Sequence, residues 1–115
     1  MAVQQDTVIV VKSSTFGEGE PDLGEKLINS FFKMLLETDK CPARILFLNS
    51  GIFLTTEGSP VIEVLKTIEK EGTEFFSCGT CLDYYGRKDK LLIGQPTNMK
   101  DTVEALYRYD RIIDV

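Results

Sequence analysis

The sequence predicts an α/β fold with a largely parallel sheet and helices on both of its faces. Short apolar runs alternate with segments of helical periodicity along the chain, which is the pattern of βαβ units. The first run, residues 7–12, is rich in β-branched residues, as expected of a strand buried on both faces. A length of 115 residues suits one domain, so we expect residues 1–115 to form a single domain.

Five strands are expected, at residues 7–12, 43–48, 74–77, 91–93 and 111–115. Asp22 and Glu25 resemble a capping box at the start of a first long helix. Ser59-Pro60 is a typical start for a second helix, which Gly72 ends. Thr97 or Asn98 caps a last helix that runs to about Tyr109.

The composition argues against several classes of partner. The net charge of -5 is unfavourable for binding nucleic acid, which requires clustered Lys and Arg, and for binding an anionic membrane surface. The apolar stretches are too short to span a bilayer, and the start of the chain does not resemble a signal peptide. Three cysteines, an odd number, do not indicate a disulfide framework. We therefore expect a cytoplasmic protein.

The most informative motif is Cys78-Gly79-Thr80-Cys81, which holds two of the three cysteines. It follows an apolar run and precedes a helix-like segment, so the thiol pair lies where a strand leads into a helix. A helix N-terminus stabilises anions, and a cysteine there is expected to lose its proton more easily. The thiolate is the form that attacks, carries sulfur or ligates metal. The motif predicts sulfur chemistry at the carboxyl end of a buried strand.

Four interpretations of the pair were compared. Zinc fits poorly, because the chain offers only one Cys pair, a distant Cys41 and no histidine. A thioredoxin-like redox pair is better, although the segment after Cys81 breaks at Gly86, too early for the long helix of such proteins. A persulfide carrier fits best, since it needs one attacking thiolate and a resolving partner. The fourth interpretation is a pair of buried cysteines that act as small apolar residues.

The glycines after the first strand do not predict a dinucleotide site. Gly17, Gly19 and Gly24 lack the spacing of that motif, and neighbouring acidic residues would repel a pyrophosphate. We expect no cofactor and no bound metal. Lys26 is the basic residue that the sequence places near this acidic loop.

The first predicted helix carries a wide apolar stripe. Leu23, Leu27, Phe31 and Leu35 recur every four residues, with further apolar residues beside them. This surplus fits a subunit interface as well as it fits the core.

The CGTC segment resembles the DsrE-like superfamily of small sulfur-handling proteins, and more closely the DsrE-like domain of YedF-type, sulfurtransferase-like selenium-metabolism proteins. The matching segments are residues 23–27, 47–51, 57–59, 77–85 and 97–99. The resemblance implies a three-layer α/β/α sandwich around a five-stranded, mainly parallel sheet. It also implies assembly into dimers, trimers or hexamers. Cys78 matches the position that carries persulfide in sulfur-relay members, and Gly86 matches the glycine that follows it. Cys81 matches a second cysteine found in some members.

YedF-type proteins usually carry an N-terminal TusA-like domain, for which this chain has no room before its first strand. The resemblance therefore implies a sulfur donor that acts in trans, either a TusA-like protein or a cysteine desulfurase.

Two hypotheses follow. In the first, Cys78 receives sulfur, or selenium, as a persulfide or its analogue held by backbone N–H groups of Gly79 and Thr80, and Cys81 releases it. Asn49 and Asn98, at neighbouring strand ends, could hydrogen-bond the bound group. In the second, the chain is a non-enzymatic binding or redox-sensing module in an oligomer, with structural cysteines.

Overall fold

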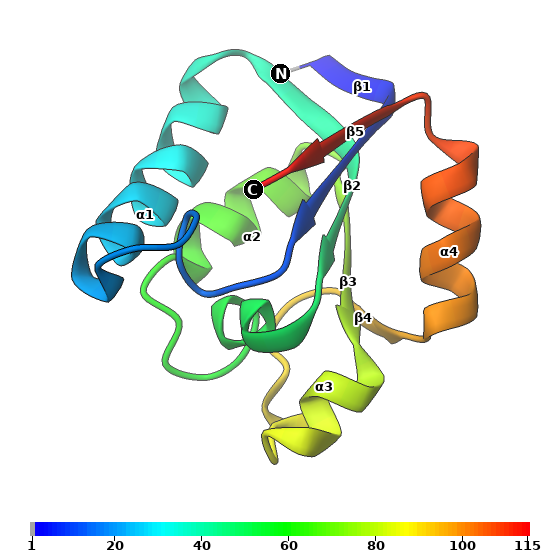
Figure 1. Cartoon of the computed structure of the whole chain (residues 1–115). Helices are drawn as coiled ribbons and strands as arrows, with labels where there is room; N and C mark the ends of the chain where they lie inside the picture. The colour runs from blue at the N-terminus through cyan, green and yellow to red at the C-terminus, as the bar shows by residue number, and fades with distance from the viewer. Residues whose placement is uncertain (1) are drawn as a thin grey trace.

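Five parallel strands form one sheet in the computed structural model, which describes residues 2–115 (Figure 1). The strands are β1 (Ala2–Val11), β2 (Lys40–Phe47), β3 (Glu74–Cys78), β4 (Gln95–Thr97) and β5 (Arg111–Asp114). Their order across the sheet is β4-β3-β2-β1-β5, and every pairing is parallel. The α/β fold with a five-stranded, mainly parallel sheet is therefore confirmed.

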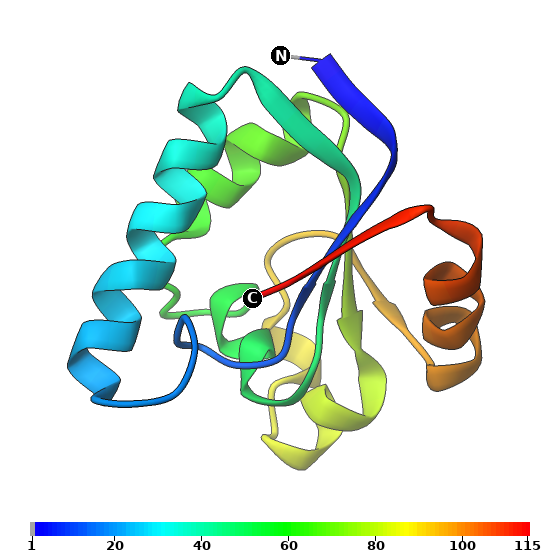
Figure 2. The same cartoon turned by 45° about the horizontal axis from the view of Figure 1, so that its top comes forward.

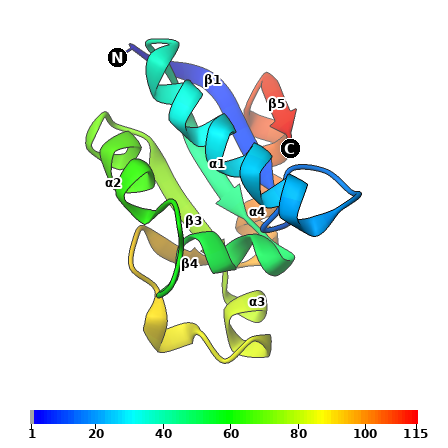
Figure 3. The same cartoon turned by 90° about the vertical axis from the view of Figure 1, so that its left-hand side faces the viewer.

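Helices lie on both faces of this sheet. They are α1 (Pro21–Glu37), α2 (Ile62–Lys70), α3 (Gly79–Tyr84) and α4 (Met99–Arg108), with 3₁₀ turns η1 (Asn49–Leu54) and η2 (Lys88–Lys90). Figure 3 shows α1 and α2 in front of the sheet and α4 behind it. The fold is thus a three-layer α/β/α sandwich. The layer of α3 and η1 closes the end of the molecule at which the strands terminate.

Each face of the sheet contributes to its own apolar core. Alternate residues of a strand point to opposite faces, so Ile9 and Val11 of β1 pack toward α1 and α2, whereas Val8 and Val10 pack toward α4. The larger core also contains Phe32, which stacks on Phe47 of β2. Burial of both faces explains why the strands are apolar runs without polar alternation.

Helix α1 buries only part of its apolar surface. Ile28 and Phe32 pack into the larger core against the sheet, Gly24 packs against Thr15 of the first loop, and all three are buried. Leu23 and Met34 remain more than half exposed, at 54% and 53%. The surplus of apolar residues predicted from the sequence is therefore exposed in the monomer.

Helix α4 starts as the sequence predicts, because the Asn98 side chain accepts a hydrogen bond from the Asp101 N–H. Helix α2 starts at Ile62, two residues later than expected from Ser59-Pro60, with Val61 as an N-cap residue that makes no side-chain capping bond. The Ser59 hydroxyl accepts the Val61 N–H in the turn ahead of the helix. The capping box predicted for α1 is wrong. Glu20 is the N-cap residue and its side chain makes no capping bond, because Pro21 begins the helix one residue earlier than expected.

The fourth strand was misplaced by the sequence prediction. Residues 91–93 do not enter the sheet; Leu91 makes only an isolated antiparallel bridge to Thr56, and Ile93 is buried in the larger core. Gly94, at φ +71°, lies so close to Phe75 that a side chain would collide with its carbonyl oxygen. The chain turns there and pairs with β3 afterwards. Pro96 is tolerated because β4 is an edge strand.

The remaining strands and the last helix lie close to their predicted ranges. β1 and β2 begin earlier than expected. In an open parallel sheet, ligand sites form beyond the carboxyl ends of the strands. In this protein that edge is built from residues 12–19, η1, the β3–α3 junction and the start of α4.

Candidate functional site

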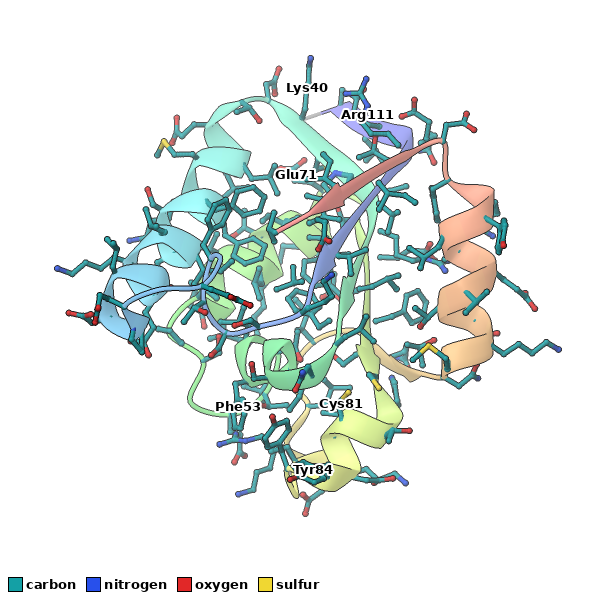
Figure 4. All side chains as sticks on the ribbon, in the orientation of Figure 1. Lys40, Phe53, Glu71, Cys81, Tyr84 and Arg111 are labelled. Carbon is teal, nitrogen blue, oxygen red and sulfur yellow. The ribbon has the colours of Figure 1, made fainter. Side chains whose placement is uncertain are left out.

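The CGTC motif bridges the last strand residue of β3 and the first turn of α3. Cys78 ends the strand and serves as the N-cap residue of the helix, and Cys81 lies within the helix. Phe75 and Ser77 on β3 are buried, so the strand that carries Cys78 is held by the core. Figure 4 shows Cys81 at the end of the molecule opposite Lys40 and Arg111, which lie near the amino ends of their strands. The thiol pair is therefore fixed at the carboxyl edge of the sheet.

Both thiols receive a backbone hydrogen bond. The Cys81 N–H donates to Sγ of Cys78 over 3.4 Å, and the Asn49 N–H donates to Sγ of Cys81 over 3.1 Å. All three cysteines of the chain are free thiols. Cys78 is 6% exposed, and Cys81 is the more exposed of the two. Main-chain donors from α3 and η1 therefore hold both sulfur atoms in position.

The pKa of the Cys81 thiol is raised above its ordinary value. Burial is the largest cause, because it penalises the charged thiolate, and the neighbouring Cys78 side chain adds to the increase. The N–H of Asn49 opposes it by stabilising the thiolate. Cys81 is consequently a thiol that holds its proton at neutral pH unless its surroundings change.

Asn49 lies opposite the thiols on η1. Its backbone has φ +52°, in the left-handed region that asparagine tolerates better than most residues. Its side-chain oxygen accepts a hydrogen bond of 3.2 Å from the Tyr85 hydroxyl. Tyr85 packs edge-on against Phe53 and Tyr84, and Figure 4 shows Phe53 and Tyr84 at the same end of the molecule as Cys81. This aromatic cluster holds η1 and α3 together around the sulfur atoms.

The thiol pair opens into a cleft of about 610 Å³, which we call the thiol cleft. It is lined by Lys12, Leu48, Asn49, Cys78, Thr80, Cys81, Tyr84, Tyr85 and Met99. A second cleft of about 690 Å³, the polar cleft, lies beside it and is lined by Lys12, Ser13, Thr15, Gly17, Glu18, Gly19, Pro21, Asn49, Ser50, Asp114 and Val115. The two clefts share Lys12 and Asn49.

The structure brings together four of the six residues singled out from the sequence. Cys78, Cys81, Thr80 and Asn49 line the thiol cleft. Gly79 does not line it; its Cα packs near the Thr97 carbonyl oxygen, where a Cβ would lie 3.2 Å from that oxygen.

Asn98 also lies outside the residues that line the thiol cleft. Its side chain accepts the Asp101 N–H over 2.8 Å, and its amide nitrogen donates to the Asp101 carboxylate over 3.4 Å. The asparagine is therefore engaged in starting α4, whereas its neighbour Met99 reaches the cleft.

Sequence reasoning overlooked Lys12. As the residue after the apolar run of β1, it reads as the solvated end of a strand, yet it lines both clefts and pairs with Asp114 at 2.9 Å. Lys26, the basic residue expected near the first loop, lines neither cleft. Glu18 does line the polar cleft, as expected of an acidic first loop. The signal that could have revealed Lys12 is its position, directly after a buried parallel strand.

Among residues 2–115, no three or more His, Cys, Asp or Glu side chains are grouped so that they could hold a metal ion. Within the same residues, no helix combines the length and apolar character needed to cross a membrane.

Two solved structures share this fold. The YchN protein of E. coli matches over 97% of this chain and 100% of its own, with a TM-score of 0.66 at 15% identity. The protein MTH1491 of Methanobacterium thermoautotrophicum, described as of unknown function, matches over 100% of both chains, with a TM-score of 0.70 at 13% identity. At these identities the likeness concerns the fold alone. A search of curated proteins gave no match.

The sequence itself matches the profile of the DsrE/DsrF-like family over residues 5–115, almost the whole chain. The match includes most of β1, the CGTC motif and β5, and so contains all the residues that line the two clefts. The chain therefore belongs to the DsrE/DsrF-like family, which is associated with sulfur relay.

Proposed function

We propose that this protein is a sulfur carrier or sulfurtransferase that holds sulfur as a persulfide on Cys78. The observation that carries the proposal is the arrangement of the two free thiols, which share one open cleft and each accept a backbone N–H. Such an arrangement provides a nucleophilic sulfur, a site for a second sulfur beside it and a neighbouring thiol for its release.

The two cysteines have different roles in this proposal. Cys81 has a raised pKa and retains its proton, which suits a thiol held in reserve. Cys78 accepts the N–H at the beginning of α3 and matches the carrier position of sulfur-relay proteins. Cys78 is therefore the carrier and Cys81 the resolving thiol.

Loading transfers the outer sulfur of a donor persulfide. The Cys78 thiolate attacks that sulfur, the donor S–S bond breaks, and the donor leaves as a thiolate while Cys78 becomes a persulfide. Delivery has two routes. An acceptor thiolate can attack the outer sulfur and regenerate the Cys78 thiolate. Alternatively, the Cys81 thiolate attacks Sγ of Cys78, which releases hydrosulfide and forms a Cys78–Cys81 disulfide; a cellular thiol must then reduce this disulfide.

Neighbouring groups would hold the added sulfur within the thiol cleft. Thr80 lines the cleft, and the first N–H groups of a helix have no intrahelical acceptor. Asn49 approaches from η1 with its N–H on Sγ of Cys81. Leu48, Tyr84 and Met99 make the rest of the wall largely apolar, and such surroundings suit a polarisable sulfur.

The resemblance to YedF-type proteins extends the proposal. It points to a TusA-like protein or a cysteine desulfurase as donor in trans, to a cytoplasmic location, to selenium as an alternative cargo and to a homo-oligomeric carrier. The exposed apolar surface of α1 supports the last of these. We propose no nucleic-acid partner, since the net charge is -5.

Incubation with a cysteine desulfurase and cysteine, followed by intact-mass measurement, tests the function. We expect the mass of one added sulfur, lost on treatment with a reductant and located on Cys78 by peptide mapping. A protein that gains no sulfur in this incubation would overturn the proposal. If it then formed a Cys78–Cys81 disulfide under mild oxidation, the redox-sensing alternative would be favoured.

A further inference from the structure

The polar cleft lies where the strand order reverses. β1 leads through α1 toward β2 on one side, and β5 returns to pair with β1 on its other side. Figure 2 shows β5 running beside β1 at this edge of the sheet, with α1 on one face and α4 on the other. In open α/β sheets the crevice at such a switch point is the usual position for a ligand. The proposed sulfur chemistry uses only the neighbouring thiol cleft, so the polar cleft still lacks a role.

Lys12 connects the two clefts. It follows the last residue of β1 and lines both cavities. Its ammonium group bonds to one carboxylate oxygen of Asp114 at 2.9 Å, and the two side chains are 55% and 57% exposed. An ammonium group has three donors, so Lys12 can accept a second carboxylate partner without losing Asp114.

The charges around the polar cleft suit a ligand that carries both signs. Lys12 is the basic side chain among the residues that line it, whereas Glu18 and Asp114 are acidic. A multiply charged phosphate would meet two carboxylates. An amino-acid headgroup, by contrast, offers a carboxylate to Lys12 and an ammonium to Asp114, and so extends the existing ion pair into an alternating set of charges.

The dimensions agree with a small molecule that spans the two cavities. Each cleft lies within the range of roughly 300–1,000 Å³ that holds small ligands, at about 690 Å³ and 610 Å³. Lys12 lines both cavities, so a headgroup bound to its ammonium lies at the boundary between the polar cleft and the thiol cleft.

We propose that the two clefts together bind a small thiol, disulfide or persulfide with an amino-acid headgroup, its carboxylate on Lys12, its ammonium on Asp114 and its sulfur at the Cys78–Cys81 pair. The proposal rests on the proposed function only in naming a persulfide as one of these ligands. It assigns the substrate class of the site, and Lys12 and Asp114 become the residues that determine specificity.

Thiol–disulfide exchange tests this proposal with four symmetrical disulfides. Cystine carries the complete headgroup, cystamine lacks its carboxylate, 3,3′-dithiodipropionate lacks its ammonium, and 2-hydroxyethyl disulfide is uncharged. In each reaction a cysteine thiolate attacks the reagent S–S bond and releases one reagent thiolate. The second cysteine then releases the other, so the protein dithiol is oxidised as the reagent is reduced. The rate of each reaction is measured by mass spectrometry of the Cys78–Cys81 peptide. For every variant, the rate with each charged reagent is divided by its rate with 2-hydroxyethyl disulfide.

Opposite changes are expected for the two charge variants. Lys12→Met should slow the reactions with cystine and 3,3′-dithiodipropionate by about 1.5-fold to fivefold, the range of an exposed ion pair, and should accelerate the reaction with cystamine, because Asp114 loses its partner. Asp114→Asn should slow cystamine and cystine and accelerate 3,3′-dithiodipropionate. Lys26→Met, on the exposed side of α1, is the matched control and should alter none of the ratios. Lys12→Gln provides a second variant if the methionine variant folds poorly.

Equal effects of Lys12→Met on all four reagents, or none, would overturn the proposal. The outcome is separable from that of the sulfur-carrier test. Headgroup selectivity without persulfide loading would retain the binding site and reject the carrier function. Persulfide loading without headgroup selectivity would retain the carrier and reject this substrate class.

Discussion

The backbone N–H of Asn49 donates a hydrogen bond to Sγ of Cys81 across 32 positions of sequence. Asn49 begins η1, just after β2, and has φ +52°. The hydroxyl of Tyr85, at the carboxyl end of α3, donates a hydrogen bond to the Asn49 side chain and holds it in place. The residue that follows a neighbouring strand thereby affects the pKa of one thiol of the motif.

Tyr85→Phe should reduce the reactivity of Cys81. The substitution keeps the ring contacts with Phe53 but removes the hydroxyl that holds Asn49. A less firmly held Asn49 N–H stabilises the thiolate less, so the pKa of Cys81 should rise further. We expect alkylation of Cys81 at neutral pH to slow by about twofold to fivefold, in line with one weakened hydrogen bond. Peptide-resolved labelling kinetics provide the measurement.

Asn49→Gly is the matched comparison. Glycine adopts φ +52° without a Cβ penalty and retains the N–H, but it loses the side-chain oxygen that Tyr85 holds, so Cys81 should label about as slowly as in the Tyr85→Phe variant. Asn49→Ala must accommodate a strained backbone at a cost of about 1–2 kcal/mol. Equal labelling rates in the alanine and glycine variants, with equal stability, would contradict the role of this backbone geometry.

The pH dependence of Cys81 follows from its raised pKa. Because the protonated thiol is favoured in the folded state, this group stabilises the protein fully below the ordinary cysteine pKa. That contribution is lost as pH rises through the raised pKa. Cys78→Ser removes one cause of the increase, so the labelling profile of Cys81 should move toward lower pH. A profile that stays in place, or moves upward, would show that the two thiols do not interact as described.

The strand, helix and motif positions near the thiols could be predicted because they depend on local patterns. The apolar run before Cys78 and the helix that follows require no knowledge of the partner strands. Asn49 could be predicted as a neighbour of the motif because it closely follows a predicted strand, but Lys12 could not. Strand order determines which loops meet, and it brings Lys12, which follows β1, into the cleft that Asn49 and the thiols line.

Asn98 and residues 91–93 each had two roles that the sequence allowed. Asn98 is predicted both to bind the sulfur group and to cap the last helix, and in the structure its side chain caps α4 through the Asp101 N–H. Residues 91–93 have the composition of a strand, but Gly94 turns the chain at its contact with Phe75 and Ile93 enters the core from outside the sheet. The contact at Asn98 is local, between residues three apart, whereas the contact that displaces residues 91–93 is tertiary.

The two motif cysteines should behave differently in persulfide loading. Cys78→Ser should abolish loading, because the carrier sulfur is gone, whereas Cys81→Ser should load normally and release sulfur more slowly. Intact-mass time courses after removal of the donor measure both steps. Cys41→Ser is a control, since Cys41 is 1% exposed and lines neither the thiol cleft nor the polar cleft. Equal loading of the Cys78→Ser variant would sink the assignment of the carrier.

The exposed side of α1 should form an interface between copies of the chain. A groove of about 320 Å³ is lined there by Phe16, Leu27, Ser30, Phe31, Met34, Leu35 and Thr38. We expect an oligomer at micromolar concentration that withstands moderate salt, because its contacts are apolar. Leu27→Glu should dissociate it, and light scattering would report the change in mass. Val103→Glu, on the exposed side of α4, should leave the mass unchanged; a monomeric natural protein would contradict the prediction.

Gly51 should be essential for the position of η1. Its Cα approaches the end of β1 so closely that a Cβ would collide with the Val11 carbonyl oxygen. That oxygen already accepts the Leu48 N–H over 2.9 Å, which ties η1 to the edge of the sheet. Gly51→Ala must therefore displace η1, and Asn49 with it, at a cost of roughly 2 kcal/mol or more in the free energy of unfolding.

Gly58→Ala is the control for this substitution. Gly58 has φ +91° and open space where a Cβ would lie, so alanine there strains only the local backbone, by about 1 kcal/mol. Denaturant unfolding measures both costs, and labelling of Cys81 measures the effect at the site. Since Asn49 lies two residues before Gly51, the Gly51→Ala variant should also change the labelling rate of Cys81, whereas Gly58→Ala should not. Should both variants label alike and lose similar stability, the close contact with β1 does not set the geometry of the thiol pair.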